Sequence, residues 1–440
     1  MVKNEILGLD FGDKRLNNRY EQIIARIEKD SKSTFPSVAK DWAWLKGFYR
    51  FFNNKKVKSK EMIKTHIKST VKRCEGEKII LVIQDTTVIN LKSANKIEGL
   101  GYTDDHKKKK GFLVHSTMAV SGESGKPLGI LNQQVIVRKK FYDRDEGYKE
   151  RLNRKKESDK WKKGAKETNK LLKVGGRIIH VSDRESDIYF YIKDIIEAKN
   201  GFVIRASQNR ITEEGYLFDT IREAEYKGEM EIKVPKKGGR KGRETTVKIY
   251  SRQITMIPPK VINHIGERIK VNIVYVEEDS KKEDRIEWLI LTSEPVDTLE
   301  DTKKIIWYYK NRWQIEEFHK GLKTGCGIEE RQLSTREQHE KLLSMFSILA
   351  WNGLLLRYNA RIPGNKDLVL DSVKIEILKE RYPELKEEVD AQKILRAVAM
   401  LGGFIGRKSD GNPGWQKIIL GLTVLEYLKQ GFLLGRKTCG

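Results

Sequence analysis

Cysteine is scarce in this chain, which has three, and they are scattered at Cys74, Cys326 and Cys439 with no paired spacing. This pattern excludes a zinc ribbon and a disulfide framework. A Gly-Lys-Ser or Gly-Lys-Thr phosphate-binding motif is also missing. Nothing in the sequence therefore points to nucleotide hydrolysis.

Long apolar segments are missing as well. The run from Leu342 to Leu356 is interrupted by Ser344, Ser347 and Asn352, and it is too short to span a bilayer. The amino terminus has no apolar core of the kind that a secretion signal carries. We therefore expect a soluble, cytoplasmic protein with no membrane partner.

Acidic residues are outnumbered by basic ones. The chain has 62 Asp and Glu residues against 87 Lys and Arg residues, and its formal net charge is +25. Such a charge favours a polyanionic partner, with nucleic acid ahead of a membrane surface. A chain of 440 residues should also divide into about three structural units.

The first 70 residues predict a small helical module. Residues 14–27 have an amphipathic, basic pattern, and aromatic residues gather between Trp42 and Phe52 among lysines and arginines. We expect the rings to form the core of the module and the cations to face outward. Those cations either bind DNA or are simply solvated.

Residues 71–375 predict an α/β domain, because β-branched runs alternate with helical patterns. Runs such as 79–83 and 177–181 are typical of strands that are buried on both faces of a sheet. The predicted strands are 79–83, 113–120, 128–137 and 177–181, and the predicted helices are 151–173 and 188–198.

Residues from about 206 to 295 predict a mostly β insertion within this domain. Short alternating strands there are broken by the basic loop 236–243. A long helix follows through residues 309–323, and residues 376–440 predict a C-terminal helical region. The sequence assigns no role to the loop 236–243 or to the charged segment 146–170.

Three acidic residues could form one site. Asp85 and Asp183 follow two buried strands, and Glu316 lies on the later helix. If the strands are neighbours, their carboxyl ends bring the acids together, and a pair of divalent cations would relieve the repulsion. Oxygen ligands select Mg²⁺ or Mn²⁺, and two such ions support an in-line phosphoryl displacement. Singly, each acid could instead serve a turn, a helix cap or a surface ion pair.

Four side chains recur at helical spacing in the later helix. Steps of three, four and seven residues place Tyr309, Arg312, Glu316 and Lys323 on one stripe, which we call the helix stripe. The stripe could bind a metal through its glutamate and phosphates through its cations. His319 shares the face of Glu316, where it could contact DNA or metal, pack in the interior or face solvent.

The two aspartate contexts and the helix stripe together resemble the signatures of DDE transposases of the insertion-sequence-four family. The aspartate contexts are Gln84–Thr87 and Ser182–Asp187. Similarity extends over nearly the whole chain, including Gly12–Arg15 and Leu401–Phe404. It implies an RNase H-like catalytic core with the β insertion, an N-terminal domain that binds transposon-end DNA (1–70), and a C-terminal dimerisation region (376–440).

The resemblance also implies roles for single residues. The ligands of two Mg²⁺ ions, for which Mn²⁺ can substitute, would be Asp85, Asp183 and Glu316. The contacts to phosphates at the transposon end would come from Tyr309, Arg312 and Lys323. Trp288 would stack on a base that is flipped out while a DNA hairpin forms, or else it is a core aromatic of its strand. Arg205 would lie near that hairpin.

The function implied is cut-and-paste DNA transposition in a bacterial, nucleoid-associated enzyme. A homodimer would hold two transposon ends in a synaptic complex, cleave them through a hairpin intermediate and join the 3′ ends to target DNA. Two alternatives stay open at this point. One is an RNase H-like nuclease or resolvase without strand transfer, and the other is a non-catalytic, transposase-derived regulator that binds DNA.

Overall fold

The computed structural model describes most of the chain. The described residues are 2–39, 41–92, 94–104, 108–138, 156–234, 242–259, 267–280, 284–407 and 410–438. Most of the basic loop 236–243, and the part of the charged segment 146–170 that precedes residue 156, lie outside these ranges.

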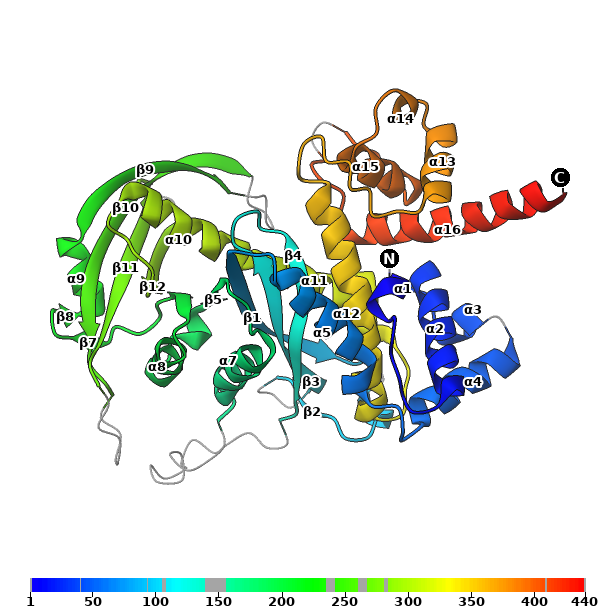
Figure 1. Ribbon diagram of the computed structural model, residues 1–440, viewed down its shortest axis with the longest axis horizontal. Coiled ribbons are helices and arrows are strands. Elements are labelled where there is room, and N and C mark those ends of the chain that lie inside the picture. The colour runs from blue at the N-terminus through cyan, green and yellow to red at the C-terminus, as the bar shows by residue number, and fades with distance from the viewer. Residues whose placement is uncertain are drawn as a thin grey trace.

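A mixed sheet forms the centre of the fold, and the described residues contribute 12 strands to it (Figure 1). The main path runs β2-β3-β1-β5-β6-β12-β11-β10-β7-β8, while β4 pairs with β3 and β9 pairs with β10. The strands are β1 (Ile79–Asn90), β2 (Gly101–Tyr102), β3 (Lys110–Ser121), β4 (Pro127–Ile136), β5 (Arg177–Ser182), β6 (Gly201–Arg205), β7 (Ile211–Thr212), β8 (Gly215–Tyr216), β9 (Glu225–Val234), β10 (Arg243–Met256), β11 (Ile269–Glu278) and β12 (Glu287–Thr292).

Strand β1 is longer than predicted, and this changes the position of Asp85. The sequence predicted a strand over 79–83 that ends before Asp85, whereas β1 continues to Asn90. Its parallel partner β5 stops early, but its antiparallel partner β3 runs alongside it and places Asp85 opposite Ser116. Asp85 therefore lies within a strand, because pairing with β3 extends β1 beyond its apolar run.

The residues predicted as a β insertion extend the same sheet. Strand β12 pairs antiparallel with β6, and β11 and β10 follow outward from β12. The β9–β12 part curves away from the β1–β5 part on the left of Figure 1. The predicted strands of this region are thus present, and they continue the central sheet instead of forming a separate one.

Helices cover both faces of the sheet. On one face, α7 (Asp159–Leu171) and α8 (Tyr189–Glu197) pack in a core around Trp161. On the other, α10 (Leu299–Asn311), α11 (Trp313–Lys320) and α12 (Arg336–Asn359) belong to the core that contains Leu81 and Ile83. The apolar run 342–356 is the buried centre of α12. The helix predicted over 151–173 is present as α7 from Asp159 to Leu171, and its predicted residues 151–155 lie outside the described ranges.

The N-terminal module is helical, as predicted. Its helices are α1 (Val2–Glu5), α2 (Lys14–Lys29), α3 (Phe35–Ala39), α4 (Trp42–Asn53) and α5 (Ser59–Cys74). Tyr20, Phe48 and Phe52 are fully buried in its core. Trp42 is an exception to the predicted aromatic core, because it stands in the first turn of α4 and is 76% exposed. The predicted boundary at residue 70 falls inside α5, which packs on α12 and β4.

The C-terminal region is also helical. It contains α13 (Ser372–Arg381), α14 (Glu384–Glu387), α15 (Ala391–Leu401) and α16 (Trp415–Thr438), and the predicted boundary at residue 376 falls inside α13. Short turns elsewhere are η1 (Ala94–Lys96), η2 (Arg184–Ser186), α9 (Leu217–Thr220), η3 (Ile221–Glu223), η4 (Gly321–Gly325) and η5 (Ile328–Glu330).

Helix α16 is an apolar segment that the sequence analysis overlooked. Its residues 415–436 are long and apolar enough to cross a membrane by length and composition alone, and 22% of the most apolar window is buried. Ion pairs from Glu426 to Lys29 (3.6 Å) and Lys374 (3.0 Å) tie the helix to α2 and α13. Its far end projects from the body of the molecule in Figure 1.

Candidate active site

The pairing of β1 with β5 brings the two aspartates to the same level. The parallel register places Ile83 beside Val181, so Asp85 and Asp183 stand two residues further along neighbouring strands. Asp183 follows the end of β5 and accepts a hydrogen bond from the backbone N–H of Glu185 (3.0 Å). Asp183 thus caps a 3₁₀ turn, η2, and its side chain has the structural role that the alternative reading as a helix cap allowed.

The helix stripe lies on two helices and a turn, and not on one helix as predicted. Helix α10 ends at Asn311 and α11 begins at Trp313, while Arg312 between them keeps helical dihedral angles. The segment then widens into the π turn η4, where the N–H of Cys326 bonds to the carbonyl of Gly321 (2.8 Å). A π turn adds one residue to the turn. The straight-helix spacing that placed Lys323 on the stripe therefore does not hold for this residue.

Arg312 joins the three acids. Its Nη2 donates to Glu316 Oε1 at 2.6 Å, and its charge lowers the pKa of both Asp85 and Asp183. Burial raises the pKa of Asp85 to about 7, with a further rise from the charges of Asp183 and Glu316. Burial also raises the pKa of Asp183. The three predicted carboxylates therefore lie within electrostatic reach of one another.

The donor chemistry fits a divalent cation. Three carboxylates offer the hard oxygen ligands that Mg²⁺ and Mn²⁺ prefer. The pKa of Asp85 is raised first by burial and then by the charge of Asp183, and a bound cation would offset both effects. Among the described residues, no three His, Cys, Asp or Glu side chains lie close enough to hold a metal ion as they stand. Side-chain movement is thus required before Asp85, Asp183 and Glu316 can share an ion.

We expect Asp85→Asn to stabilise the folded chain at high pH in the presence of a chelator. Because the pKa of Asp85 is raised to about 7, the folded state favours the protonated form, and its contribution to stability is lost as pH rises through 7. Asparagine is neutral and can still accept the hydrogen bond from Thr86 N. The free energy of unfolding at pH 8.5 should rise by about 2 to 4 kcal/mol, measured by urea denaturation.

The control for this prediction is Asp194→Asn, since Asp194 is a half-exposed acid on α8 that pairs with Lys162. We expect this variant to gain no stability at high pH. If the free energy of unfolding varies with pH in the same way for wild type and Asp85→Asn from pH 5 to pH 8.5, the pKa of Asp85 is not raised in the folded chain.

Two buried histidines, His115 and His319, lie next to the β1 segment that carries Asp85. His319 Nδ1 is 3.8 Å from Asp85 Oδ2, and His319 Nε2 lies 3.2 Å from Ser116 Oγ. His115 bonds to Thr86 Oγ1 (2.9 Å) and to the side chain of Gln84. Burial lowers the pKa of each histidine to about 3, so both rings are neutral. Of the readings that the sequence left open for His319, the structure favours packing in the interior.

Lys160 is a residue that the sequence analysis did not single out. It lies in the first turn of α7, its side chain is 5% exposed, and its Nζ is 3.2 Å from Glu185 Oε2. Its charge lowers the pKa of Asp183. In the sequence it is one of many lysines in a charged segment, and only the adjacent buried Trp161 signals that this stretch packs against the sheet.

The predicted DNA-contacting residues form a partly continuous group. Tyr309 is 7% exposed and packs edge-on against Trp288, with ring centroids 5.5 Å apart. The Arg312 guanidinium lies 5.8 Å from the Tyr309 ring. Arg205 donates to the carbonyl of Glu287, next to Trp288 (2.8 Å). Lys323 lies on the π turn, and its charge lowers the pKa of His319.

Two known protein families match this chain, one over the central sheet and one over the N-terminal module. Residues 76–352 match the family described as Transposase DDE domain. The chain belongs to the DDE transposase family. Members of this family are DNA-cleaving and transposing enzymes that use divalent metals, generally Mg²⁺. Residues 1–57 match the family described as Transposase DNA-binding, which covers α1 to α4 of this transposase.

One solved structure is distantly similar to this DDE transposase. It is the cryo-EM structure of the piggyBac transposase synaptic complex with hairpin DNA, which is 11% identical with a TM-score of 0.38. The match covers 79% of this chain and 66% of that chain. A likeness this low does not identify a shared fold.

Proposed function

We propose that this DDE transposase moves its element by cut-and-paste transposition and is a member of the insertion-sequence-four family. It would bind inverted terminal repeats, cleave them by two-metal phosphoryl transfer with a hairpin intermediate, and join the 3′ ends to target DNA. The observation that carries the proposal is the meeting of Asp85 and Asp183 across the β1–β5 register, with Glu316 joined to both through Arg312. The core would be RNase H-like.

In this proposal Asp85, Asp183 and Glu316 would hold two Mg²⁺ ions, and bound ions would supply activation of the attacking oxygen and stabilisation of the leaving oxygen. Arg312 would release Glu316 and turn to a phosphate of the transposon end, and this exchange would free the Glu316 carboxylate to move toward the two aspartates. Lys323 on the π turn offers a second cation for the same strand.

Trp288 and Arg205 are proposed to act on the hairpin. Trp288 opens β12 and is only partly buried against Tyr309, so one part of its ring can accept a flipped base. Arg205 bonds to the carbonyl of Glu287, the residue before Trp288, so a base stacked on Trp288 would have a cation nearby. Both residues are therefore proposed to bind DNA near the cleavage site.

The N-terminal module is proposed to bind the transposon end through α4. Trp42, Lys46 and Arg50 follow one another at four-residue spacing, so they share one face of the helix, and all three are exposed. The opposite side of α4 carries the buried Phe48 and Phe52. An exposed stripe of two cations and an indole on a helix suits the edge and backbone of duplex DNA.

We also propose a homodimer that holds both ends in a synaptic complex, and a nucleoid-associated, cytoplasmic location. Exposed apolar side chains on α16 support the dimer. They include Leu420 (52% exposed), Leu428 (38%) and Leu433 (39%). A second copy would cover this surface, which a soluble monomer would leave in water. Sedimentation at increasing concentration, with and without end DNA, would measure the association.

Strand transfer separates this proposal from its alternatives. We expect the purified chain with Mg²⁺ to join a pre-cut transposon-end duplex to a supercoiled plasmid, giving integrants that are detected by gel and sequencing. An RNase H-like nuclease or resolvase would hydrolyse the end without forming integrants. A regulator would bind the end and leave it intact. Either result would contradict the proposed transposition.

A further inference from the structure

Glu317, the neighbour of Glu316, is buried on the interior side of α11. It is 6% exposed, and its carboxylate pairs with Arg357 (3.0 Å) and Lys320 (2.8 Å) and accepts the indole N–H of Trp415 (3.3 Å). Successive residues of a helix point about 100° apart. The contacts of Glu317 therefore fix the rotation of the helix that presents Glu316 to the other acids.

The Trp415 indole packs against a set of glycines. A Cβ on Gly353 of α12 would lie 2.7 Å from the ring, and a Cβ on Gly321, the first residue of the π turn, would lie 3.0 Å from it. Gly325, the last residue of that turn, also adjoins the ring. Arg357 stands over the indole, 5.1 Å from the ring centre. The ring thus bridges α12 and the π turn that carries Lys323.

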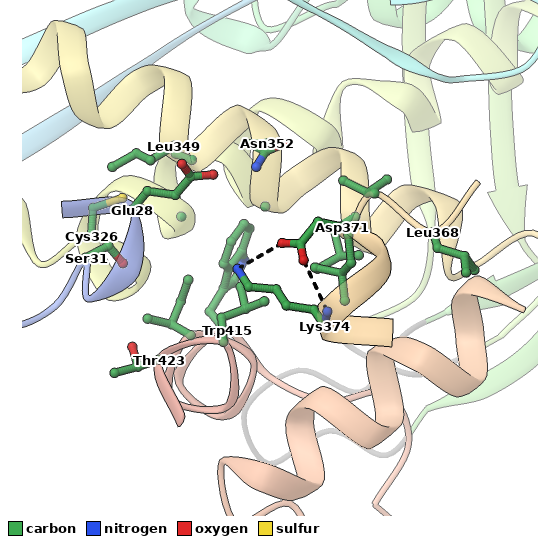
Figure 2. A pocket seen from close by; sticks show the side chains of 18 of the residues that line it. Glu28, Ser31, Cys326, Leu349, Asn352, Leu368, Asp371, Lys374, Trp415 and Thr423 are labelled. Carbon is green, nitrogen blue, oxygen red and sulfur yellow. Dashed lines mark hydrogen bonds and ion pairs between the residues drawn. The ribbon is translucent and has the colours of Figure 1, made fainter. Parts of the chain in front are cut away.

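The indole also borders open space. A cavity of about 610 Å³ is lined by Trp415, by Gly321 and Gly353, and by residues of α2, α12, α13 and α16 (Figure 2). The ring is therefore not enclosed by protein on every side. Its hydrogen bond to Glu317 and its contact with Arg357 are the polar contacts that hold it beside the glycines.

Trp415 is also the first residue of α16, the helix with the exposed apolar side chains. The helix begins beside α12 and runs outward, away from the body of the molecule, in Figure 1. The ring that contacts the π turn and the exposed apolar side chains therefore belong to one continuous helix.

We infer that Trp415, Glu317 and Arg357 form a positioning group for the active site. They hold Glu316 and Lys323 in the geometry for reaction, and they make that geometry depend on the seating of α16. The inference rests on the proposed function, because Glu316 and Lys323 matter only if they act on DNA. None of the three residues is proposed to touch the substrate.

The test is Trp415→Phe, which keeps an aromatic ring over the glycines and removes the indole N–H. We expect its affinity for end DNA to stay within twofold of wild type, while single-turnover strand transfer at saturating DNA falls by about tenfold or more. Glu317→Gln, which keeps the side-chain shape and removes the charge, should show the same split. This pattern of unchanged binding and slower reaction would not arise from general loss of stability.

Trp351→Phe is the matched control. Trp351 is equally buried, lies on α12 and donates its indole N–H to the carbonyl of Pro127 (3.2 Å), away from the catalytic helix. It should lose as much thermal stability as Trp415→Phe and keep the wild-type transfer rate. Wild-type transfer by both Trp415→Phe and Glu317→Gln would overturn the inference, as would equal slowing in Trp351→Phe. Absence of transfer by the wild-type chain would instead overturn the proposed function.

Discussion

Glu316→Gln and Asp183→Asn are each expected to lower Mg²⁺-dependent cleavage of transposon-end DNA by about a thousandfold or more. Each change removes an anionic oxygen ligand and leaves the side-chain shape nearly unchanged. Glu316 is 28% exposed and bonded to Arg312, so its loss should not unfold the chain. Cleavage is measured on a radiolabelled end duplex in single-turnover conditions, with end binding measured in parallel.

The two variants should still bind the end with wild-type affinity, because the N-terminal module supplies that contact. Asp194→Asn on α8 is the control for a change in charge, since it is also an acid-to-amide substitution but lies away from the β1–β5 edge. We expect it to cleave at the wild-type rate. Full activity in Glu316→Gln would show that Glu316 takes no part in cleavage. The proximity of Asp85, Asp183 and Glu316 would then serve only the folded structure.

The sequence predicts those parts of the site that depend only on the local residue pattern and on which strands are neighbours. The β-branched runs at 79–83 and 177–181 do form β1 and β5, and their parallel register is what brings Asp85 level with Asp183. The end of β1 could not be predicted, because residues 84–90 owe their strand conformation to pairing with β3 and not to their own apolar pattern.

Other features depend on contacts between distant segments. The π turn after Glu316 packs against Trp415 through Gly321, and these residues are far apart in the chain. Lys160 looks like any lysine of its charged segment until α7 packs on the sheet. The exposure of the Trp42 side chain could not be predicted from the sequence either, because an aromatic residue next to core residues is expected to be buried with them. Local pattern carries none of this information.

We expect end-DNA affinity to fall steeply with salt. The net charge of +25 and the exposed cations of α4 make phosphate contacts the main source of affinity. If about six phosphates are neutralised, log K should fall with log salt concentration at a slope of about −5. Affinity would then drop by about a thousandfold between 50 and 200 mM salt, as measured by fluorescence anisotropy of a labelled end duplex.

Single substitutions test where those phosphates bind. Lys46→Gln or Arg50→Gln, on the exposed face of α4, should each reduce the size of the slope by about 1. Lys386→Gln changes the net charge by the same amount but lies on α14, where Lys386 pairs with Glu380. It should leave the slope unchanged. Because counterion release counts contacts and not total charge, a slope near zero in the wild type, or equal effects of all three changes, would rule out α4 as the surface that binds the transposon end.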